Sequence, residues 1–388
     1  MHLQASRFHD YEFNRVAFQT RNLLFKQNNM QKRIEKILQK TPGLKAKNIA
    51  KKLGLERTQV NSFLYKNMEI FSKDEDHCWR LKTMPELRIE FASNTWIDCH
   101  LFEQALATVS SPLDSEISTI VFVISEDCKI LLEAIARLMA LANQLIYKNK
   151  IVVIDFTQCP DTLSYLNRMS FFDHLSNDVT VLPEHNKISV VKGNNDTLVE
   201  FGAIDPVEPD ESIPKKLKLS FVNHAGDKYS QAAFTVLTEL FGNVRDHSDS
   251  PIPGFVALQC YKNGRVPHIQ TVISDSGKGI IGTLKPILEK KYPKIFKEIS
   301  KSETDFDGLL LKKVFTKGEI SQSEEKGRGL GLKSSSDAAS KFNATILVRQ
   351  ENCEAKLSYK NGKLSEFLFK PDLPRILGTH ICFDFLLD

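Results

Sequence analysis

The sequence predicts an α/β protein, of the multidomain α+β kind, built from three parts. Its 388 residues exceed what one hydrophobic core usually encloses, which favours two or three domains. Residues 30–83 have the pattern of short helices followed by a hairpin, and residues 84–215 alternate strand-like and helical runs. Between residues 216 and 388, apolar strands lead into glycine-rich segments, which is the third observation behind this fold class.

The composition is that of a globular protein, with 41% apolar and 26% charged residues. No apolar run reaches the roughly 18 residues that a membrane-spanning helix needs, and the first residues lack the apolar segment of a signal peptide. The seven cysteines are scattered and never form a CxxC pair, which predicts reduced thiols rather than a zinc site or disulfides. We therefore expect a cytoplasmic protein with no membrane partner.

The net charge of +4 is unevenly distributed along the chain. Residues 1–83 carry 17 Lys and Arg against 8 Asp and Glu, a balance of +9, so the remainder sums to −5. A basic segment attached to a mildly acidic body suggests a polyanionic partner, although solvated lysine faces are common. Residues 1–29 form a polar arm without clear periodicity, and we expect this arm to pack on a neighbouring element or on a second subunit.

Residues 30–83 contain the pattern of three short helices and a hairpin. Apolar residues at helical spacing mark one helix on each side of the breaker TPG at 41–43, and a third helix follows Gly54. Residues 69–81 then have the pattern of two short strands around a polar turn. The segment LKAKNIAKKLGLERTQVNSFLY, with the Trp79 that trails it, resembles the winged helix-turn-helix family.

In that family the third helix commonly enters a groove of a duplex. The resemblance implies nucleic-acid contacts by four residues that match the spacing in winged helices binding Z-form nucleic acid: Arg57, Asn61, Tyr65 and Trp79. The base-reading signal is poor, so such binding is expected to be weakly sequence-specific. The alternative is a winged helix that binds protein, in which Tyr65 and Trp79 complete the core.

Residues 84–215 alternate between strand-like runs rich in Ile and Val and helical stretches. The alternation predicts a small α/β domain with a partly parallel sheet. The segment IVVIDFTQCPDTLSYL also resembles STAS domains, which implies a protein partner and a phosphoacceptor at Thr162 or Ser164. The segment lacks the Asp-Ser-Ser/Thr-Gly motif of that family, so ordinary capping or surface roles for both hydroxyls stay open.

Residues 239–247 combine an apolar helix face with a polar stripe. Glu239, Asn243 and His247 are spaced four apart, so at about 100° per residue they share one narrow sector of a helix. Leu240 and Val244 mark the neighbouring apolar sector. An acid, an amide and an imidazole in one line are unusual for a helix that only packs on a core.

Three segments downstream carry glycine or threonine where a strand ends or a helix begins. The apolar run VISDSGKGI leads into an Asp-Ser-Gly-Lys-Gly turn, the run KGRGLGLKSSS opens a helix with three glycines, and ILGTHICFDFLL starts a closing strand. One glycine-rich loop alone is weak, because it can be a turn. Four elements in this order, with the polar stripe first, form a specific pattern.

Together these segments resemble the GHKL superfamily of gyrase-type ATPases, Hsp90, MutL proteins, histidine kinases and anti-sigma serine kinases. The resemblance covers residues 216–388 and implies an α/β sandwich whose mixed sheet is covered by helices on one face. It also implies ATP and Mg2+ as ligands. The matching residues are Glu239, Asn243 and His247 for the N box, Asp275, Gly277 and Gly279 for the first glycine box, Gly327, Gly329 and Gly331 for the second, and Thr379 near the end of the domain.

The resemblance implies a role for each residue type. A carboxylate such as Asp275 accepts a hydrogen bond from the exocyclic amino group of adenine and rejects the carbonyl of guanine. Glycines expose backbone N–H groups to phosphates at a helix N-terminus, and Asn243 supplies a hard oxygen ligand for Mg2+. Glu239 orients or deprotonates an attacking water. His247 is the least specific member, because a histidine at a helix end often serves only as a cap.

Three functions remain open. The first is an ATPase or ATP-driven switch coupled to the winged helix, with an ATP-linked homodimer. The second is a Ser/Thr protein kinase acting on a STAS-like acceptor, and the third is a non-enzymatic adaptor stabilised by nucleotide. We favour the ATPase because Glu239 and Asn243 occur together, whereas histidine kinases usually carry Asn at the first of these positions.

Two further segments bear on this choice. Residues 283–313 are longer than the same region of compact anti-sigma kinases, which argues against the kinase. The polar segment 315–328 is expected to be a lid that orders over ATP, with Lys317 and Arg328 as solvated cations.

Overall fold

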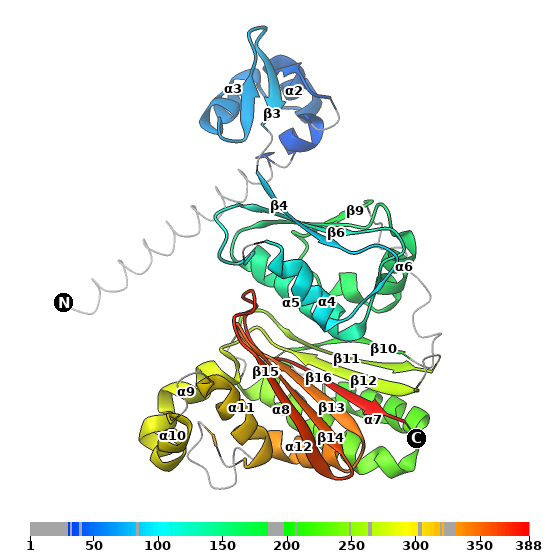
Figure 1. Ribbon diagram of the computed structural model, residues 1–388. Coiled ribbons are helices and arrows are strands. Elements are labelled where there is room, and N and C mark those ends of the chain that lie inside the picture. Colours follow the sequence, from blue (N-terminus) through cyan, green and yellow to red (C-terminus); the bar gives the residue numbers. More distant parts are fainter. Residues whose placement is uncertain are drawn as a thin grey trace, which may run out of the picture. The chain divides into compact units, whose positions relative to one another are not determined.

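The computed structural model describes most of the chain, in two compact units, Met1–Pro85 and Glu86–Asp388 (Figure 1). Residues 1–29, Gly327, Arg328 and Gly329 lie outside the described residues, and so do the expectations of an N-terminal arm and of dimerisation through it. The described residues are 30–31, 33–38, 41–82, 85–109, 111–184, 198–205, 208, 210–247, 250–262, 266–301, 305–318, 320–321 and 331–387, without the side chains at 198–200 and 246–247.

The first unit has the elements that the sequence predicts. Residues 30–31 and 33–38 are helical, and the strands pair antiparallel in the order β1-β3-β2. Ile34, Val60 and Trp79 belong to a hydrophobic core of this unit alone. Three helices and a hairpin are thus confirmed, while membership of the winged-helix family stays a prediction. The elements are β1 (Leu44–Lys45), α2 (Ala46–Leu53), α3 (Arg57–Lys66), β2 (Phe71–Lys73) and β3 (Cys78–Leu81).

The second unit begins with an α/β layer. Its sheet is parallel throughout, in the order β4-β6-β8-β9, because each strand returns through a crossover connection. The predicted alternation of strands and helices is confirmed. The elements are β4 (Glu86–Phe91), β5 (Trp96–Ile97), α4 (Cys99–Ala107), β6 (Thr119–Ile124), β7 (Lys129–Ile130), α5 (Leu132–Tyr147), β8 (Ile151–Asp155), α6 (Pro160–Arg168), the 3-10 turn η1 (Phe171–Asp173) and β9 (Thr180–Leu182).

The rest of the second unit is built on a seven-stranded sheet in the order β10-β11-β12-β16-β13-β14-β15. Its strands are β10 (Leu198–Ile204), β11 (Gly254–Tyr261), β12 (His268–Ser274), β13 (Ala344–Arg349), β14 (Glu354–Lys360), β15 (Lys363–Lys370) and β16 (His380–Leu386). Its helices are α7 (Ser212–Ala225), η2 (Asp227–Tyr229), α8 (Ser230–His247), α9 (Gly279–Lys291), α10 (Pro293–Ile299), α11 (Phe306–Thr316) and α12 (Gly331–Ser340).

The central strands of this sheet are apolar on both faces. Val256 and Leu258 belong to the core beneath α7 and α8. Phe255, Ala257 and Val272 instead join the core of the α/β layer, where α5 packs against β11, β12 and β16 (Figure 1). Successive residues of a strand point to opposite faces, so a strand buried on both sides is apolar at nearly every position.

The expectation of a mixed sheet covered by helices on one face is therefore wrong in two respects. Every strand pair described for this sheet is antiparallel, and α5 covers its second face. Helix α5 is buried on nearly all sides because it lies between this sheet and β8 of the parallel sheet. The sheet also begins with β10, which lies within the range 84–215.

Within the described part of the chain, no helix has the length and apolar character that crossing a membrane requires.

Candidate nucleotide-binding site

Helix α8 places the first two residues of the polar stripe beside its buried face. Leu240 and Val244 are buried in the core under the sheet, whereas Glu239 is exposed and Asn243 is partly buried. The helical spacing predicted for this segment is thus confirmed. His247 is the last residue of α8, and its side chain lies outside the described residues.

The carboxylate of Glu239 lies against the start of α12. A Cβ placed on Gly331 would come within 2.4 Å of Glu239 Oε2, so only glycine leaves room for the acid in this position. Helix α12 begins at Gly331 and packs along α8. Glu239 and Gly331 are therefore adjacent, at a helix N-terminus, where the first N–H groups have no partner within the helix.

Asn243, one turn after Glu239 on α8, carries an unpaired polar atom. Its Nδ2 is buried and has no hydrogen-bond partner among the described residues. A buried polar group without a partner costs about 1–3 kcal/mol unless a ligand supplies the missing bond. The next residue, Val244, packs on Gly254, where an added Cβ would lie 2.3 Å from Val244 Cγ1 and 3.1 Å from Ser274 O. This close approach brings the helix carrying Asn243 onto the end of β12.

Asp275 follows β12 directly, and its carboxylate is almost fully buried. The N–H of Gly277 donates to Asp275 Oδ1 at 2.8 Å, and Thr379 donates through both its N–H and its hydroxyl. Burial raises the pKa of Asp275 to about 6, and these hydrogen bonds oppose the rise because they favour the ionised form. A carboxylate has about four acceptor positions, so it can still accept another N–H donor.

Two glycines let the flanking loops meet at this carboxylate. Gly378 has a φ of +95°, and a Cβ there would lie 2.0 Å from the carbonyl oxygen of Asp275. Gly279 has a φ of +71°, and its Cβ would lie 3.0 Å from the carbonyl oxygen of Gly378. The N–H of Asp275 donates to Thr379 O at 2.9 Å. A side chain at either glycine would force the loops apart.

Two further polar residues border this site, and the sequence analysis missed them. Gln350, just after β13, accepts the N–H groups of Ile280 and Ile281 at 2.7 and 3.2 Å and so caps the start of α9. Gln144, from α5, donates to the hydroxyl of Ser276 at 2.9 Å. The only sequence signal for Gln144 is an amide within an apolar helix, which is also typical of a surface position.

No protein-family model matches the chain, and no curated protein matches it. What the site can do is therefore inferred from its own residues. A buried carboxylate can accept an N–H donor, and an amide with an unpaired nitrogen can donate to a ligand while its oxygen ligates a hard cation. An exposed carboxylate beside a helix N-terminus can take a proton from water. Lys317, which follows α11, is exposed.

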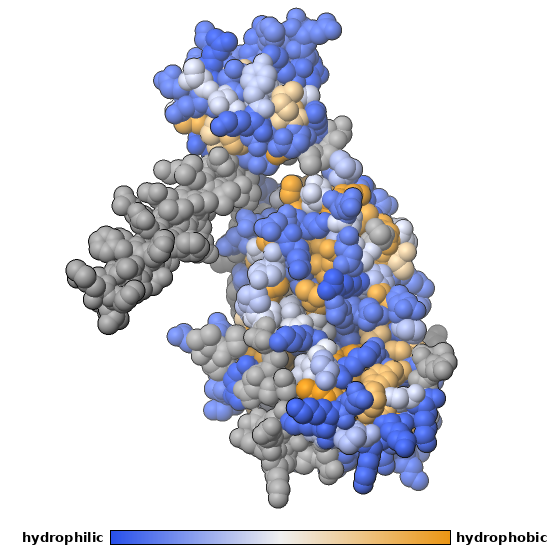
Figure 2. All heavy atoms as spheres, turned by 90° about the vertical axis from the view of Figure 1, so that its left-hand side faces the viewer, coloured by the Kyte–Doolittle hydropathy of each residue, from blue (hydrophilic) through white to orange (hydrophobic). Residues whose placement is uncertain are grey.

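The first unit carries the four residues that the sequence links to nucleic acid. Arg57 and Tyr65 on α3 are exposed, Asn61 is partly buried, and Trp79 is 1% exposed. The Tyr65 ring meets the Trp79 ring edge-on, with centroids 5.1 Å apart, and Lys73 Nζ lies 5.0 Å from the Tyr65 centroid. The visible face of this unit is mainly hydrophilic (Figure 2). Trp79 thus supports Tyr65 from the core instead of facing a ligand.

The two hydroxyls considered as phosphoacceptors differ in access. Thr162 is 4% exposed, and its hydroxyl donates to Cys128 O at 2.5 Å. Ser164 is exposed and accepts a hydrogen bond from Arg168 at 3.0 Å. An enzyme acting on this folded layer could reach Ser164 but not Thr162.

Proposed function

We propose that the second unit binds ATP with Mg2+ and hydrolyses it slowly, and that bound nucleotide acts as a conformational switch. The observation that carries this proposal is the convergence of four segments that lie far apart in the sequence. Glu239 lies against Gly331, the helix of Asn243 packs on the strand end before Asp275, and Thr379 donates to Asp275. The GHKL resemblance implies this same grouping.

The chemistry of the residues fits an adenine nucleotide. Asp275 can accept the exocyclic amino group of adenine, where guanine has a carbonyl oxygen. Asn243 is the residue that would hold Mg2+, because its amide oxygen is a hard ligand that suits this ion. Its buried, unpaired Nδ2 is a donor that would pair with a phosphate oxygen. When bound, the ion neutralises charge on the phosphates and polarises the γ-phosphoryl group. Mg2+ in such sites is commonly held mainly by substrate phosphates and water, with one or two protein oxygen ligands.

Glu239 is the general base in this proposal. Water attacks the γ-phosphorus, the bond to the bridging oxygen breaks, ADP leaves, and the proton of the water passes to Glu239. The start of α12 beside Glu239 favours a phosphate, because unpaired N–H groups and the helix dipole act together there. Turnover is expected to be slow because the sequence offers no evident arginine finger.

The test follows the γ-phosphate of labelled ATP. The full chain is incubated with Mg2+ and γ-labelled ATP beside Glu239→Gln and the control Glu289→Gln, an exposed carboxylate on α9. We expect free phosphate from the wild type and from Glu289→Gln, and about a hundredfold less from Glu239→Gln with ATP binding retained. Label on the protein would instead indicate a kinase and direct attention to Ser164. Bound ATP with neither product would indicate the adaptor.

For the first unit we propose nucleic-acid binding through α3. The support is the exposed Arg57 and Tyr65 and the basic charge of residues 1–83. Binding of a labelled duplex should weaken steeply with salt, and Arg57→Ala should lower the slope of log K against log salt by about one. Arg80→Ala is the matched control, since this exposed arginine pairs with Asp74 on the hairpin. A salt-independent or absent shift would favour a protein-binding module.

A further inference from the structure

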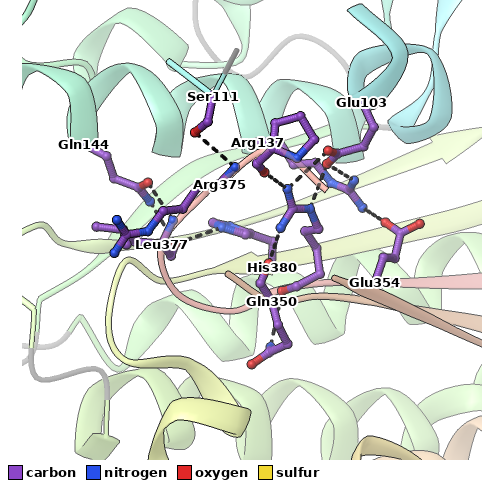
Figure 3. Close-up of polar contacts among 11 residues, drawn as sticks. Glu103, Ser111, Arg137, Gln144, Gln350, Glu354, Arg375, Leu377 and His380 are labelled. Carbon is purple, nitrogen blue, oxygen red and sulfur yellow. Dashed lines mark hydrogen bonds and ion pairs between the residues drawn. The ribbon is translucent and has the colours of Figure 1, made fainter. Parts of the chain in front are cut away.

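The α/β layer contributes a side chain to the candidate nucleotide site. Gln144 lies on α5 and is fully buried. Its Nε2 donates to Ser276 Oγ and to Leu377 O, both at 2.9 Å, and its Oε1 accepts the N–H of Leu377, also at 2.9 Å. One amide therefore makes three hydrogen bonds to two loops of the neighbouring sheet (Figure 3 shows the pair with Leu377).

Both loops held by Gln144 belong to the Asp275 site. Ser276 is the residue after Asp275, and Leu377 precedes the pair Gly378 and Thr379. The bare α-carbon of Gly378 lies against the backbone of Asp275, and Thr379 donates to its carboxylate. Gln144 therefore bridges the loop that carries the carboxylate and the loop that carries its donor.

A second set of contacts fixes the same loop from outside. The N–H of Arg375 donates to Ser111 Oγ at 3.2 Å, and its guanidinium pairs with Asp114 at 3.0 Å. Ser111 and Asp114 lie in the segment after α4, so the loop before Thr379 is attached to the α/β layer at an exposed end and at a buried end (Figure 3). The buried end is the one beside Asp275.

We propose that Gln144 is a positioning residue of the nucleotide site, which sets the place of the Asp275 carboxylate and thereby the preference for adenine over guanine. This inference rests on the proposed function. The physical reason is that the planar amide of Gln144 holds Ser276 and Leu377 in fixed positions relative to each other. Without the amide, their buried polar groups lose partners, and the loops shift to recover hydrogen bonds.

The preference for ATP over GTP is the measurement that distinguishes a positioning role of Gln144 from a role in stability alone. The carboxylate meets only the base, whereas the phosphates bind elsewhere, so tripolyphosphate affinity reports the phosphate subsite alone. Asn143 is the matched control. It is the adjacent residue of α5, it is buried, and its hydrogen bonds to His174 O and the N–H of Ser176 stay within the α/β layer.

The experiment measures equilibrium binding of ATP, GTP and tripolyphosphate, each with Mg2+, to the full chain by calorimetry. In Gln144→Met we expect ATP affinity to fall about tenfold and the ATP-to-GTP ratio to fall with it, while tripolyphosphate affinity is unchanged. Asn143→Leu should lower thermal stability but keep the ratio. An unchanged ratio in Gln144→Met, or an equal fall in both variants, would overturn the inference.

Two outcomes keep this test separate from that of the proposed function. If the wild type binds no ATP, or binds ATP and GTP equally, the proposed function itself fails. If Gln144→Met does not fold, Ser276→Ala replaces it, because this change removes one acceptor of Gln144 and leaves α5 intact. Its ATP-to-GTP ratio should also fall, and a ratio equal to that of the wild type would overturn the inference.

Discussion

At the scale of single residues, the candidate site depends on glycines, because their lack of a Cβ leaves space for a neighbouring group. Gly331 makes room for the carboxylate of Glu239, and Gly378 makes room for the backbone of Asp275. The two cases differ in kind. The neighbour of Gly331 is the end of a flexible side chain, which can move, whereas the neighbour of Gly378 is backbone, which cannot. A substitution at Gly331 should therefore disturb chemistry more than folding.

Gly331→Ala tests this distinction. The new Cβ would displace Glu239, and a misplacement of about 1 Å can lower kcat by about a hundredfold. The control is Gly242→Ala on α8, where nothing lies within 4 Å of the added Cβ and an alanine stabilises a helix by about 0.5–1 kcal/mol. Phosphate release and thermal unfolding are measured for both. Equal activity in the two variants would contradict the placement of Glu239.

Asp275 predicts a pH dependence of opposite sign for folding and for binding. Burial raises its pKa from 3.8 to about 6, so the folded state holds the proton more tightly than the unfolded state. Its contribution to stability is full below pH 4 and is lost as the pH rises through 6. The proposed contact with adenine needs the ionised form as acceptor, so ATP affinity should rise about tenfold per pH unit up to pH 6 and level off above it.

The measurement is ATP affinity from pH 5 to 8, with the free energy of unfolding at pH 7. Asp275→Asn should stabilise the nucleotide-free protein by roughly 1–3 kcal/mol at pH 7 and abolish the preference for ATP. Glu133→Gln is the control, because burial raises the pKa of Glu133 to about 7 but its carboxyl lies on α5, outside the site. A flat affinity profile in the wild type would refute the role of Asp275.

At the scale of elements, α5 and β13 are joined by buried charges. Glu103 on α4 pairs with Arg137 on α5 at 2.7 Å and with Arg349 on β13 at 2.9 Å, and Arg137 also pairs with Glu354 on β14. Glu103, Arg137 and Arg349 are at most 2% exposed. These pairs link the two layers through charged side chains that are buried in the interior. Breaking one of them would leave an uncompensated charge in the interior.

Arg349→Met should destabilise the second unit by about 3–5 kcal/mol, because Glu103 would then lack one of its two cationic partners in a buried place. Arg375→Met is the matched control, since that guanidinium pairs with Asp114 and Glu351 but is 44% exposed. Its cost should stay below about 1 kcal/mol. Urea unfolding followed by circular dichroism gives both values. If Arg349→Met lost less unfolding free energy than Arg375→Met, these buried charges would not hold the layers together.

Much of the element order could be predicted from the sequence. Runs of Ile and Val predict the strands β6 and β8, alternating apolar residues predict β4, and apolar residues at helical spacing predict α8. The covering of the second sheet face could not be predicted, because it depends on α5 meeting a sheet more than a hundred residues away. The signal was present in part: α5 is apolar around most of its circumference, which is typical of a helix between two layers.

For the candidate site, too, local patterns could be predicted from the sequence and long-range contacts could not. Asp275 and Thr379 are assigned to the candidate site through the GHKL resemblance, and the structure places them side by side. Gln144 and Gln350 could not be predicted, since nothing near them in the chain tells a buried bridging amide from a solvated one. Trp79 shows the converse: its spacing matched a ligand contact, but its ring is buried under Tyr65.

At the scale of the whole molecule, the chain divides at residue 85 but not near residue 216. The seven-stranded sheet includes β10, and its central strands share a core with the α/β layer. Phe255, Ala257, Val272 and Cys382 are all buried on that side. The α/β layer therefore belongs to the same folding unit as the candidate nucleotide site.

This division predicts how fragments behave. Residues 86–388 should fold alone and bind ATP with the affinity of the full chain, because they retain both cores of the second unit.

Residues 198–388 keep the whole seven-stranded sheet but lose α5, so Phe255 and Val272 would face water and Arg349 would lose Glu103. An exposed apolar sheet face of this kind favours aggregation. We expect this fragment to be insoluble or to bind a dye for exposed apolar surface. Sedimentation and ATP titration of the two fragments test this prediction. If fragment 198–388 were monodisperse and bound ATP with full affinity, the α/β layer would be an independent domain. Gln144 would then have no physical basis as a positioning residue.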